Sequence, residues 1–294
     1  MDLCDRFAEE YFPKLRPATA RDYGIAIRKY IKPALGRHKV ASVSHSAIAA
    51  LHHRVTTSAS YQANRTVALL SRMFNLSIRW GWRSDNPAKG IERNQETKRH
   101  RYLSSDELAG LTTAFAEHPD HQAVNIFRLL LLTGARRGEV LAAKWGDLDL
   151  TTGAWTKPGA TTKQKTLHRV PLSAPARQLL TDLHRDRGES EFVFPGRLNG
   201  HRVEVKGDWA AICRAAKIKN LRIHDLRHSY ASQLVSAGFS LPIIGALLGH
   251  TQPATTHRYA HLQDDPLRVA TERVGAIIAG GNTAEVVPLM KAVR

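Results

Sequence analysis

The segment Val124-Asn-Ile-Phe-Arg-Leu-Leu-Leu-Leu132 constrains the fold most strongly, because it is apolar nearly all round. A helix with this pattern has no face for solvent and is typical of the centre of a domain. Thr133-Gly134 ends it, and a new helix directly afterwards would present Arg136 and Glu139 on one face at i,i+3. We therefore expect a domain built around this helix, with Arg136 held rigidly at its end. An ordinary surface ion pair is the alternative for these two residues.

The flanking sequence predicts a mainly helical domain with a small antiparallel sheet. Leu103-Ser-Ser-Asp-Glu107 is typical of a helix start, with serine caps and acids in the first turn. Residues 147–171 are short and strand-like around a turn at Asp149–Gly153. Three lysines lie in or near the strand connection, and by composition alone they are ordinary loop residues: Lys157, Lys163 and Lys165. Amphipathic patterns predict further helices over residues 173–187 and 206–217.

The first hundred residues read as a separate helical unit. Helical spacing covers residues 2–11 and 19–30, and Pro33 with Gly36 is expected to end the second helix. Ser44 is suited to capping a third helix. The fourth, over about residues 58–80, carries one apolar stripe that should face the core, formed by Ala63, Val67, Leu70, Phe74 and Ile78.

A row of arginines lies on the opposite side of this fourth helix. Arg65, Arg72 and Arg79 are seven residues apart, so they drift only about 40° around the helix. No acid interrupts the run from Arg65 to Arg83. We interpret the row as a phosphate-contacting surface, because guanidinium donors match phosphate oxygens. A solvated helix face is the alternative.

A domain boundary follows. Proline in Asp85-Asn-Pro87 should end the helix, and residues 89–101 are basic with few apolar anchors. The expected organisation is a helical domain over 1–95, a basic linker over 96–102 and a second domain over 103–294. Lys98, Arg99 and Arg101 could follow a DNA backbone, although a solvated spacer would look the same.

The charge balance favours a polyanion as partner. The formal net charge is +17 and the pI is near 10.3, which places nucleic acid before a membrane surface. No apolar run approaches the ~20 residues of a spanning helix, and the N-terminus lacks a signal-peptide pattern, so we expect a cytoplasmic protein. Two cysteines, Cys4 and Cys213, are too few for a disulfide framework.

Residues 224–259 hold a set of side chains that could cut and rejoin a phosphodiester without metal. His224 and Arg227 are i,i+3 on a predicted helix that continues through about Val235. His250 follows a glycine that should end a helix, so its side chain can project from the turn. Tyr259 follows nine residues later, as a possible nucleophile.

Two other readings of this region are weaker. His224 and His228 have the i,i+4 spacing of zinc ligands, but the glutamate of HExxH and any cysteine or acid cluster are missing, so no metal is expected. Tyr230 lies on the arc of the helix that should be buried, which places it in the core and leaves Tyr259 as the candidate nucleophile.

The order and spacing of five motifs, which hold six candidate catalytic residues, resemble the signature of the tyrosine recombinases, also called phage integrases. The motifs are Thr-Gly-Ala-Arg136-Arg-Gly-Glu139, Lys163 eight residues before Pro171, His224-Asp-Leu-Arg227-His, Leu-Gly-His250 and Tyr259. The resemblance covers nearly the whole chain, including Asn64-Arg65 of the first domain. It implies a mainly α fold with a small antiparallel sheet, arranged as a two-domain DNA clamp.

The resemblance also implies roles. Tyr259 would attack the scissile phosphorus and form a 3′-phosphotyrosyl enzyme with a free 5′-hydroxyl, without ATP, metal or another cofactor. Arg136 and Arg227 would clamp the non-bridging oxygens, and His250 would donate a hydrogen bond to the phosphate. His224 would act in proton transfer with the nucleophile. Lys163 resembles the general acid for the leaving 5′-oxygen, and Glu139 an orienting acid.

The implied activity is site-specific DNA recombination and integration of a mobile element in the bacterial or phage nucleoid. The implied partners are double-stranded DNA, a homotetramer on two DNA sites and accessory DNA-bending or directionality proteins. A helix at about 266–278 would pack onto the neighbouring protomer. The chain begins almost directly with the core-binding helices, so it is either of a simpler group or a shorter form of a longer integrase. A type IB topoisomerase and a non-cleaving DNA-binding regulator remain as alternatives.

Overall fold

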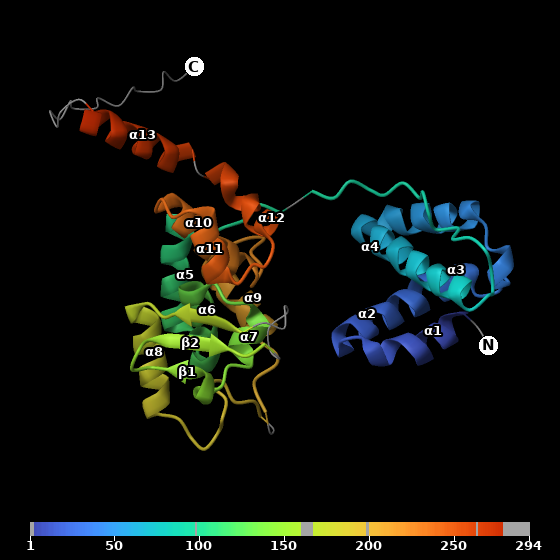
Figure 1. Ribbon diagram of the computed structural model, residues 1–294. Coiled ribbons are helices and arrows are strands. Elements are labelled where there is room, and N and C mark those ends of the chain that lie inside the picture. The colour runs from blue at the N-terminus through green and yellow to red at the C-terminus, as the bar shows by residue number, and fades with distance from the viewer. Residues whose placement is uncertain (1–2, 98, 160–166, 198–199, 263, 279–294) are drawn as a thin grey trace. The chain divides into compact units, whose positions relative to one another are not determined.

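The computed structural model describes residues 3–97, 99–159, 167–197, 200–262 and 264–278 (Figure 1). Its contacts divide the chain into two compact units, Met1–Arg99 and His100–Arg294. Each unit has its own buried apolar cluster. Within the described ranges, no helix is long and apolar enough to cross a membrane.

The first unit is entirely helical in its described part. Its elements are α1 (Leu3–Tyr11), a 3₁₀ turn η1 (Phe12–Lys14), α2 (Pro17–Ala26), a π-helical turn η2 (Ile27–Ile31), α3 (Lys32–Leu35), a 3₁₀ turn η3 (Val40–Ser42) and α4 (His45–Arg79).

The predicted helix end at Pro33 is wrong. The chain continues from α2 through the π-helical turn into α3, and Gly36 alone marks the end. The Lys32 N–H bonds to the Ile27 carbonyl, five residues back, and Pro33 then lies in the first turn of α3. Pro33 has no N–H and donates no hydrogen bond to the preceding turn, yet the backbone stays helical as far as Leu35.

The two helices that periodicity predicted follow one another as α4, with a kink between them at Ala59, where φ is −159° and ψ is 77°. Ser44 caps the first of them, as expected, with its Oγ accepting from the Ala47 N–H at 3.1 Å. The second ends at Arg79, in agreement with the predicted range to about residue 80, so Pro87 is not what ends it. The predicted stripe is confirmed, because Ala63, Val67, Leu70 and Phe74 are buried in the core of the unit.

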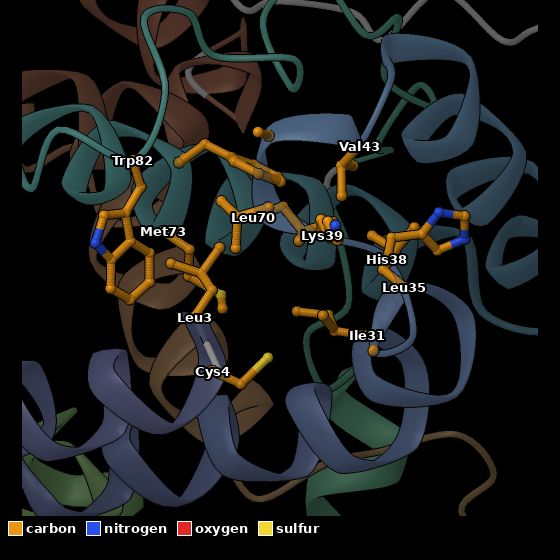
Figure 2. Close-up of a pocket in the computed structure, with 14 residues that line it drawn as sticks. Leu3, Cys4, Ile31, Leu35, His38, Lys39, Val43, Leu70, Met73 and Trp82 are labelled. Carbon is orange, nitrogen blue, oxygen red and sulfur yellow. The ribbon is translucent and has the colours of Figure 1, made fainter. Parts of the chain in front are cut away.

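An apolar pocket of about 530 Å³ lies in this unit (Figure 2). Leu3 and Cys4 of α1 face Leu70 and Met73 of α4 across it, with Ile31 from the π-helical turn. These residues belong to the core of the first unit, and the pocket contains none of the candidate catalytic residues.

The second unit is mainly helical around one small sheet (Figure 1). Its helices are α5 (Ser105–Glu117), α6 (His121–Thr133), α7 (Arg137–Leu141), α8 (Ala174–Arg185), α9 (Lys206–Ala215), α10 (Asp225–Ser236), α11 (Leu241–Leu248), α12 (Pro253–Thr256) and α13 (Asp264–Ile278), with 3₁₀ turns η4 (Trp145–Asp147) and η5 (His257–Leu262). The expected central helix is α6, whose Ile126, Phe127 and Leu129 are fully buried.

The sheet has the order β1 (Leu148–Asp149), β2 (Ala154–Lys157) and β3 (His168–Pro171), with antiparallel neighbours. Trp155 pairs with Val170, and both are buried. Trp155 belongs to the core cluster that includes α6. Lys163 lies in the β2–β3 connection, outside the described residues. The last residue of β2, Lys157, points into the protein and is 2% exposed.

Candidate active site

Gly134 sets the path of the chain into the site. It ends α6 in the left-handed conformation, with φ at 60°. A Cβ at this position would come within 2.3 Å of Tyr230 Cδ1, so both the backbone angle and the packing require glycine. Arg136, two residues on, is the N-cap residue of α7.

Arg136 is held by Glu139, as the i,i+3 spacing indicated. Its Nη1 donates to Glu139 Oε1 at 2.7 Å, and its backbone N–H donates to Oε2 at 3.1 Å. Lys157 Nζ donates to the same Oε2 at 3.1 Å. Burial raises the pKa of Glu139, but the charge of Lys157 and the hydrogen bonds from Arg136 and Lys157 outweigh it and lower the pKa to about 2.

Arg227 lies at the centre of the site and is 4% exposed. Its Nη1 donates to the Gly134 carbonyl at 2.8 Å and its Nη2 to the Leu248 carbonyl at 2.7 Å. The guanidinium therefore joins the ends of α6 and α11 to α10. Burial and the neighbouring charge of Arg136 lower the pKa of Arg227 to about 10, so it stays protonated at neutral pH.

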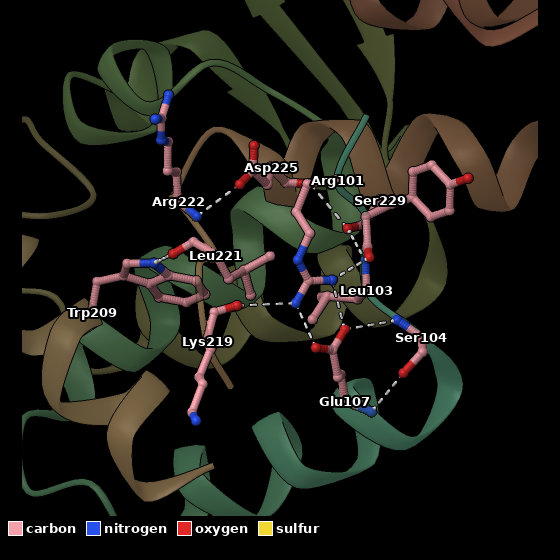
Figure 3. A network of polar contacts seen from close by, with 11 residues as sticks. Arg101, Leu103, Ser104, Glu107, Trp209, Lys219, Leu221, Arg222, Asp225 and Ser229 are labelled. Carbon is pink, nitrogen blue, oxygen red and sulfur yellow. Dashed lines mark hydrogen bonds and ion pairs between the residues drawn. The ribbon is translucent and has the colours of Figure 1, made fainter. Parts of the chain in front are cut away.

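The start of α10, which carries His224 and Arg227, is fixed from its far side (Figure 3). Asp225 accepts from the Arg222 N–H at 2.8 Å, and Ser229 Oγ joins the Asp225 carbonyl to the Leu103 N–H. Thus α10 is anchored to the segment before α5. Burial is the main cause that lowers the pKa of His224, reinforced by the charge of Arg227.

His250 projects from the turn after α11, as predicted. Gly249 ends the helix with φ at 65°, and a Cβ there would reach 2.7 Å from the His168 ring. His250 Nδ1 lies 2.8 Å from Oγ1 of Thr256, which is buried. Burial, followed by the charges of Arg227 and Arg136, lowers the pKa of His250 to about 4.

Tyr259 lies in η5 and is 4% exposed. Its hydroxyl is 2.7 Å from His228 Nδ1, on the next turn of α10 after His224. Burial raises the pKa of Tyr259, while the charges of Arg258 and Arg227 oppose this effect. Tyr230, the other tyrosine of the region, is half-buried and packs against Gly134, outside the candidate cavity.

These side chains meet in one cavity of about 490 Å³. Its lining includes five of the six predicted catalytic residues, namely Arg136, His224, Arg227, His250 and Tyr259. The sixth, Lys163, falls outside the described residues. Two guanidinium groups beside a tyrosine hydroxyl can hold the oxygens of a phosphodiester while that hydroxyl attacks phosphorus.

Three residues in the cavity or beside its lining residues were not predicted to act. His228 was considered only as a zinc ligand, and Lys157 only as a loop lysine. Arg258 lines the cavity, with its Cζ 5.9 Å from the centre of the Tyr259 ring. The i,i+4 spacing of His224 and His228 was the one available signal that both histidines lie near one site.

In the first unit, the three arginines of α4 have exposed side chains. The Arg72 guanidinium donates to the Tyr11 hydroxyl and lies 5.4 Å from the centre of its ring. Asn64 differs from them because it is 6% exposed, and its amide bonds internally to His52, the Asn94 backbone and Glu96. Its observed role is to hold residues 94–96 against α4.

The linker candidates have distinct surroundings. The Arg101 guanidinium forms a two-pronged pair with Glu107, at 2.7 and 2.5 Å, and belongs to the second unit (Figure 3). Arg99 is half-buried, and Lys98 lies outside the described residues. Among the residues that the structure describes, no three His, Cys, Asp or Glu side chains gather as a metal site would need.

Comparisons with family models and with known proteins agree on one family. Residues 101–265 match the model of the phage integrase family, and residues 1–54 match the phage integrase N-terminal SAM-like domain. The shufflon-specific DNA recombinase of Escherichia coli is 32% identical over 225 residues, which are 71% of this chain and 55% of that protein. This chain thus spans about half the length of that relative. Tyrosine recombinase XerC of Xanthomonas axonopodis pv. citri is 30% identical over 226 residues, covering 73% of this chain and 71% of that protein.

Solved structures share the fold. The Tn1549 transposon integrase in complex with transposon right end DNA superposes with a TM-score of 0.78 at 18% identity, covering 94% of this chain and 100% of that one. A lambda integrase tetramer bound to a Holliday junction has a TM-score of 0.70 at 20% identity, covering 85% of this chain and 77% of that one. The predicted mainly α fold with a small antiparallel sheet is confirmed. Because the family model covers more than half of the sequence, the chain belongs to the phage integrase family of tyrosine recombinases.

Proposed function

We propose that this protein is a site-specific DNA recombinase that cleaves and rejoins DNA through a 3′-phosphotyrosyl intermediate on Tyr259. One observation carries the proposal: Arg136, Arg227 and His250 line the same cavity as the Tyr259 hydroxyl. A cavity lined by arginines favours a phosphate, because their positive charges neutralise the charge that develops on it. The covalent intermediate keeps the energy of the phosphodiester, so no ATP is needed.

In the proposed reaction, the Tyr259 oxygen bonds to phosphorus and the bond to the 5′-oxygen breaks. The tyrosine proton leaves to a base in the site, and the 5′-oxygen takes a proton from a general acid. Lys163 is our candidate for this acid, on the resemblance alone. Arg136 and Arg227 bind the non-bridging oxygens, and His250 donates a hydrogen bond to the phosphate.

Double-stranded DNA is the proposed substrate, since the net charge is +17 and solved relatives are described in complex with DNA. We propose residues 1–95 as the DNA-binding domain, with Arg65, Arg72 and Arg79 contacting phosphate, residues 96–102 as the linker and residues 103–294 as the catalytic domain. Accessory DNA-bending proteins and a location on the bacterial nucleoid belong to the same proposal.

A homotetramer is the proposed working assembly, as described for lambda integrase on a Holliday junction. Helix α13 carries four large apolar side chains that are at least 55% exposed: Val269, Val274, Ile277 and Ile278. An apolar groove of about 700 Å³ between α5, α6 and α10, lined among others by Phe115, Leu131 and Leu234, offers a surface for such a helix from a neighbouring protomer.

The test is covalent capture on a duplex copied from the ends of the mobile element that flanks the gene, nicked near the exchange point. Wild-type protein should give an SDS-resistant adduct, and Tyr259→Phe should give none while binding the duplex with wild-type affinity. Tyr230→Phe is the matched control and should keep the adduct. An adduct from Tyr259→Phe, or none from wild type, would end the proposal in favour of a different nucleophile or a non-cleaving regulator. Efficient relaxation of non-specific supercoiled plasmid would favour the topoisomerase alternative.

A further inference from the structure

The partner of the Tyr259 hydroxyl is His228, which lies one helical turn beyond His224. His228 Nδ1 and the hydroxyl oxygen are 2.7 Å apart, and the two residues are 8% and 4% exposed. The ring of His224 lies edge-on to that of His228, with centroids 5.0 Å apart, and His224 is the more exposed of the two residues. Of the two histidines, His228 is therefore the one that contacts the candidate nucleophile.

We propose that His228 is a catalytic residue that orients the Tyr259 hydroxyl and accepts its proton as the phenolic oxygen attacks phosphorus. This inference rests on the proposed function and changes the assignment that resemblance implied, in which His224 takes part in this proton transfer. A general base has to lie within hydrogen-bond reach of the proton that it removes, and His228 meets this condition directly.

The surroundings of His228 keep its imidazole neutral before substrate binds. Burial is the main cause that lowers its pKa to about 4, and the charges of Arg258 and Arg227 add to it, as does that of His224 when it is protonated, against the opposing Asp225 carboxylate. With its proton on Nε2, the neutral ring offers an Nδ1 lone pair to the hydroxyl. Burial also raises the pKa of Tyr259, so the phenol remains protonated and donates this hydrogen bond.

Substrate binding would strengthen this base. A phosphodiester in the cavity places negative charge beside Arg227 and Arg258, and the charge offsets the repulsion that these cations exert on a protonated His228. The pKa of His228 should therefore rise as the phosphate arrives. This coupling restricts formation of the phenolate to sites that hold DNA.

The atoms of the step balance as follows. The O–H bond of Tyr259 breaks and its proton moves to His228 Nδ1, while the phenolic oxygen forms a bond to phosphorus. The P–O5′ bond breaks, and the 5′-oxygen takes a proton from the separate general acid. On rejoining, the 5′-hydroxyl returns its proton to the deprotonated general acid as its oxygen attacks phosphorus. The bond between phosphorus and the Tyr259 oxygen breaks, and His228 returns its proton to that oxygen.

Two substitutions separate proton acceptance from positioning. In His228→Asn, the amide oxygen lies near the place of Nδ1 and can accept the hydrogen bond, but it cannot take the proton. We expect His228→Asn to cleave about 10²-fold or more slowly and His228→Phe more slowly still, with unchanged DNA affinity. The control His257→Asn changes an exposed histidine two residues before Tyr259, and it should cleave at the wild-type rate.

The leaving group tells which proton His228 moves. The probe is the nicked duplex captured by wild type, made with either a 5′-oxygen or a 5′-bridging sulfur at the scissile position. A thiolate leaves without protonation, so the loss in His228→Asn should persist with sulfur, whereas a defect in the general acid should largely disappear. Rescue of His228→Asn by sulfur would assign the histidine to the leaving group and overturn the inference.

A measurement without DNA tests the contact itself. In ¹⁵N NMR of the free protein, His228 should be neutral at pH 7 as the Nε2–H tautomer, and Tyr259→Phe should shift its Nδ1 resonance downfield by removing the hydrogen bond. An unshifted Nδ1 resonance, or a His228→Asn rate within threefold of wild type, overturns the inference alone. Absence of a wild-type adduct instead removes the proposed function, and this inference with it.

Discussion

Lys157 adds a buried positive charge behind Arg136. It is 2% exposed, its Nζ pairs with Glu139, and it lies 4.4 Å from the centre of the Trp155 ring. Burial lowers the pKa of Lys157, although Glu139 opposes this effect. The pair thus stabilises the charge of Glu139 more than the charge of Lys157. Its net contribution to the free energy of unfolding is therefore smaller than the depressed pKa of Glu139 alone indicates.

Lys157→Met should lower the free energy of unfolding by about 1–3 kcal/mol at pH 7, because Glu139 would lose one of its two cationic partners. The surface pair of Lys144 with Glu191 is the matched control, and Lys144→Met should cost less than about 1 kcal/mol. Glu139 has a depressed pKa, so its contribution to stability is present above its usual pKa of 4.5 and is lost only as pH falls through about 2. In Lys157→Met this loss should begin at higher pH. Urea titrations at several pH values measure both effects.

His228 should make the second unit less stable in mild acid. Its pKa is depressed from 6.5 to about 4, so its contribution is fully present above pH 6.5 and is lost as pH falls through about 4. Between pH 7 and 4.5 the free energy of unfolding should drop by up to about 2 kcal/mol from this residue. His228→Asn should flatten the curve by that amount, whereas the exposed-site variant His257→Asn should leave it unchanged. A parallel curve for His228→Asn would contradict the prediction.

At the scale of elements, the left-handed ends of α6 and α11 deliver Arg136 and His250 to the cavity. At each end a neighbouring side chain leaves no room for a Cβ. Tyr230 packs against Gly134, and the His168 ring packs against Gly249. Arg227 holds both helix ends in place, because it donates hydrogen bonds to the carbonyls of Gly134 and Leu248. The same guanidinium that lines the proposed phosphate site therefore also fixes the helices that form this cavity.

Gly134→Ala should destabilise the second unit by about 3 kcal/mol or more, since the new Cβ combines an unfavourable φ with a clash against Tyr230 and Leu248. Gly138→Ala, four residues on in α7, is the control, because nothing lies within 4 Å of its Cβ. It should be neutral or stabilise by up to about 1 kcal/mol. Thermal unfolding compares the two, and equal effects would sink this account of the α6 end.

At the scale of the whole molecule, the structure has two units with separate cores, and in our proposal DNA binding by α4 and cleavage by Tyr259 belong to different units. Arg72→Ala should therefore weaken binding of the duplex and reduce the slope of log K against log salt by about 1, without changing the cleavage rate at saturating protein. Arg185→Ala removes an exposed arginine on α8 and should leave the slope unchanged. Fluorescence anisotropy over a salt series measures both. An unchanged slope for Arg72→Ala would return the α4 row to a solvated helix face.

The sequence by itself determined the features that depend on near neighbours. The periodicity of residues 124–132 predicted the buried α6, and the i,i+3 spacing predicted the pairing of Arg136 with Glu139. Serine and acid spacing likewise predicted the start of α5, where Ser104 and Glu107 form a capping box. These features were readable because helix geometry relates residues a few positions apart.

Only the tertiary structure decided which distant side chains meet. The bond of His228 to Tyr259 spans 31 positions and depends on how η5 packs against α10. The burial of Lys157 depends on the packing of β2 against α7, and Asn64 is used internally because residues 94–96 fold back onto α4. Periodicity specifies which face of an element is buried, whereas the partner on that face is set by the packing of several elements at once.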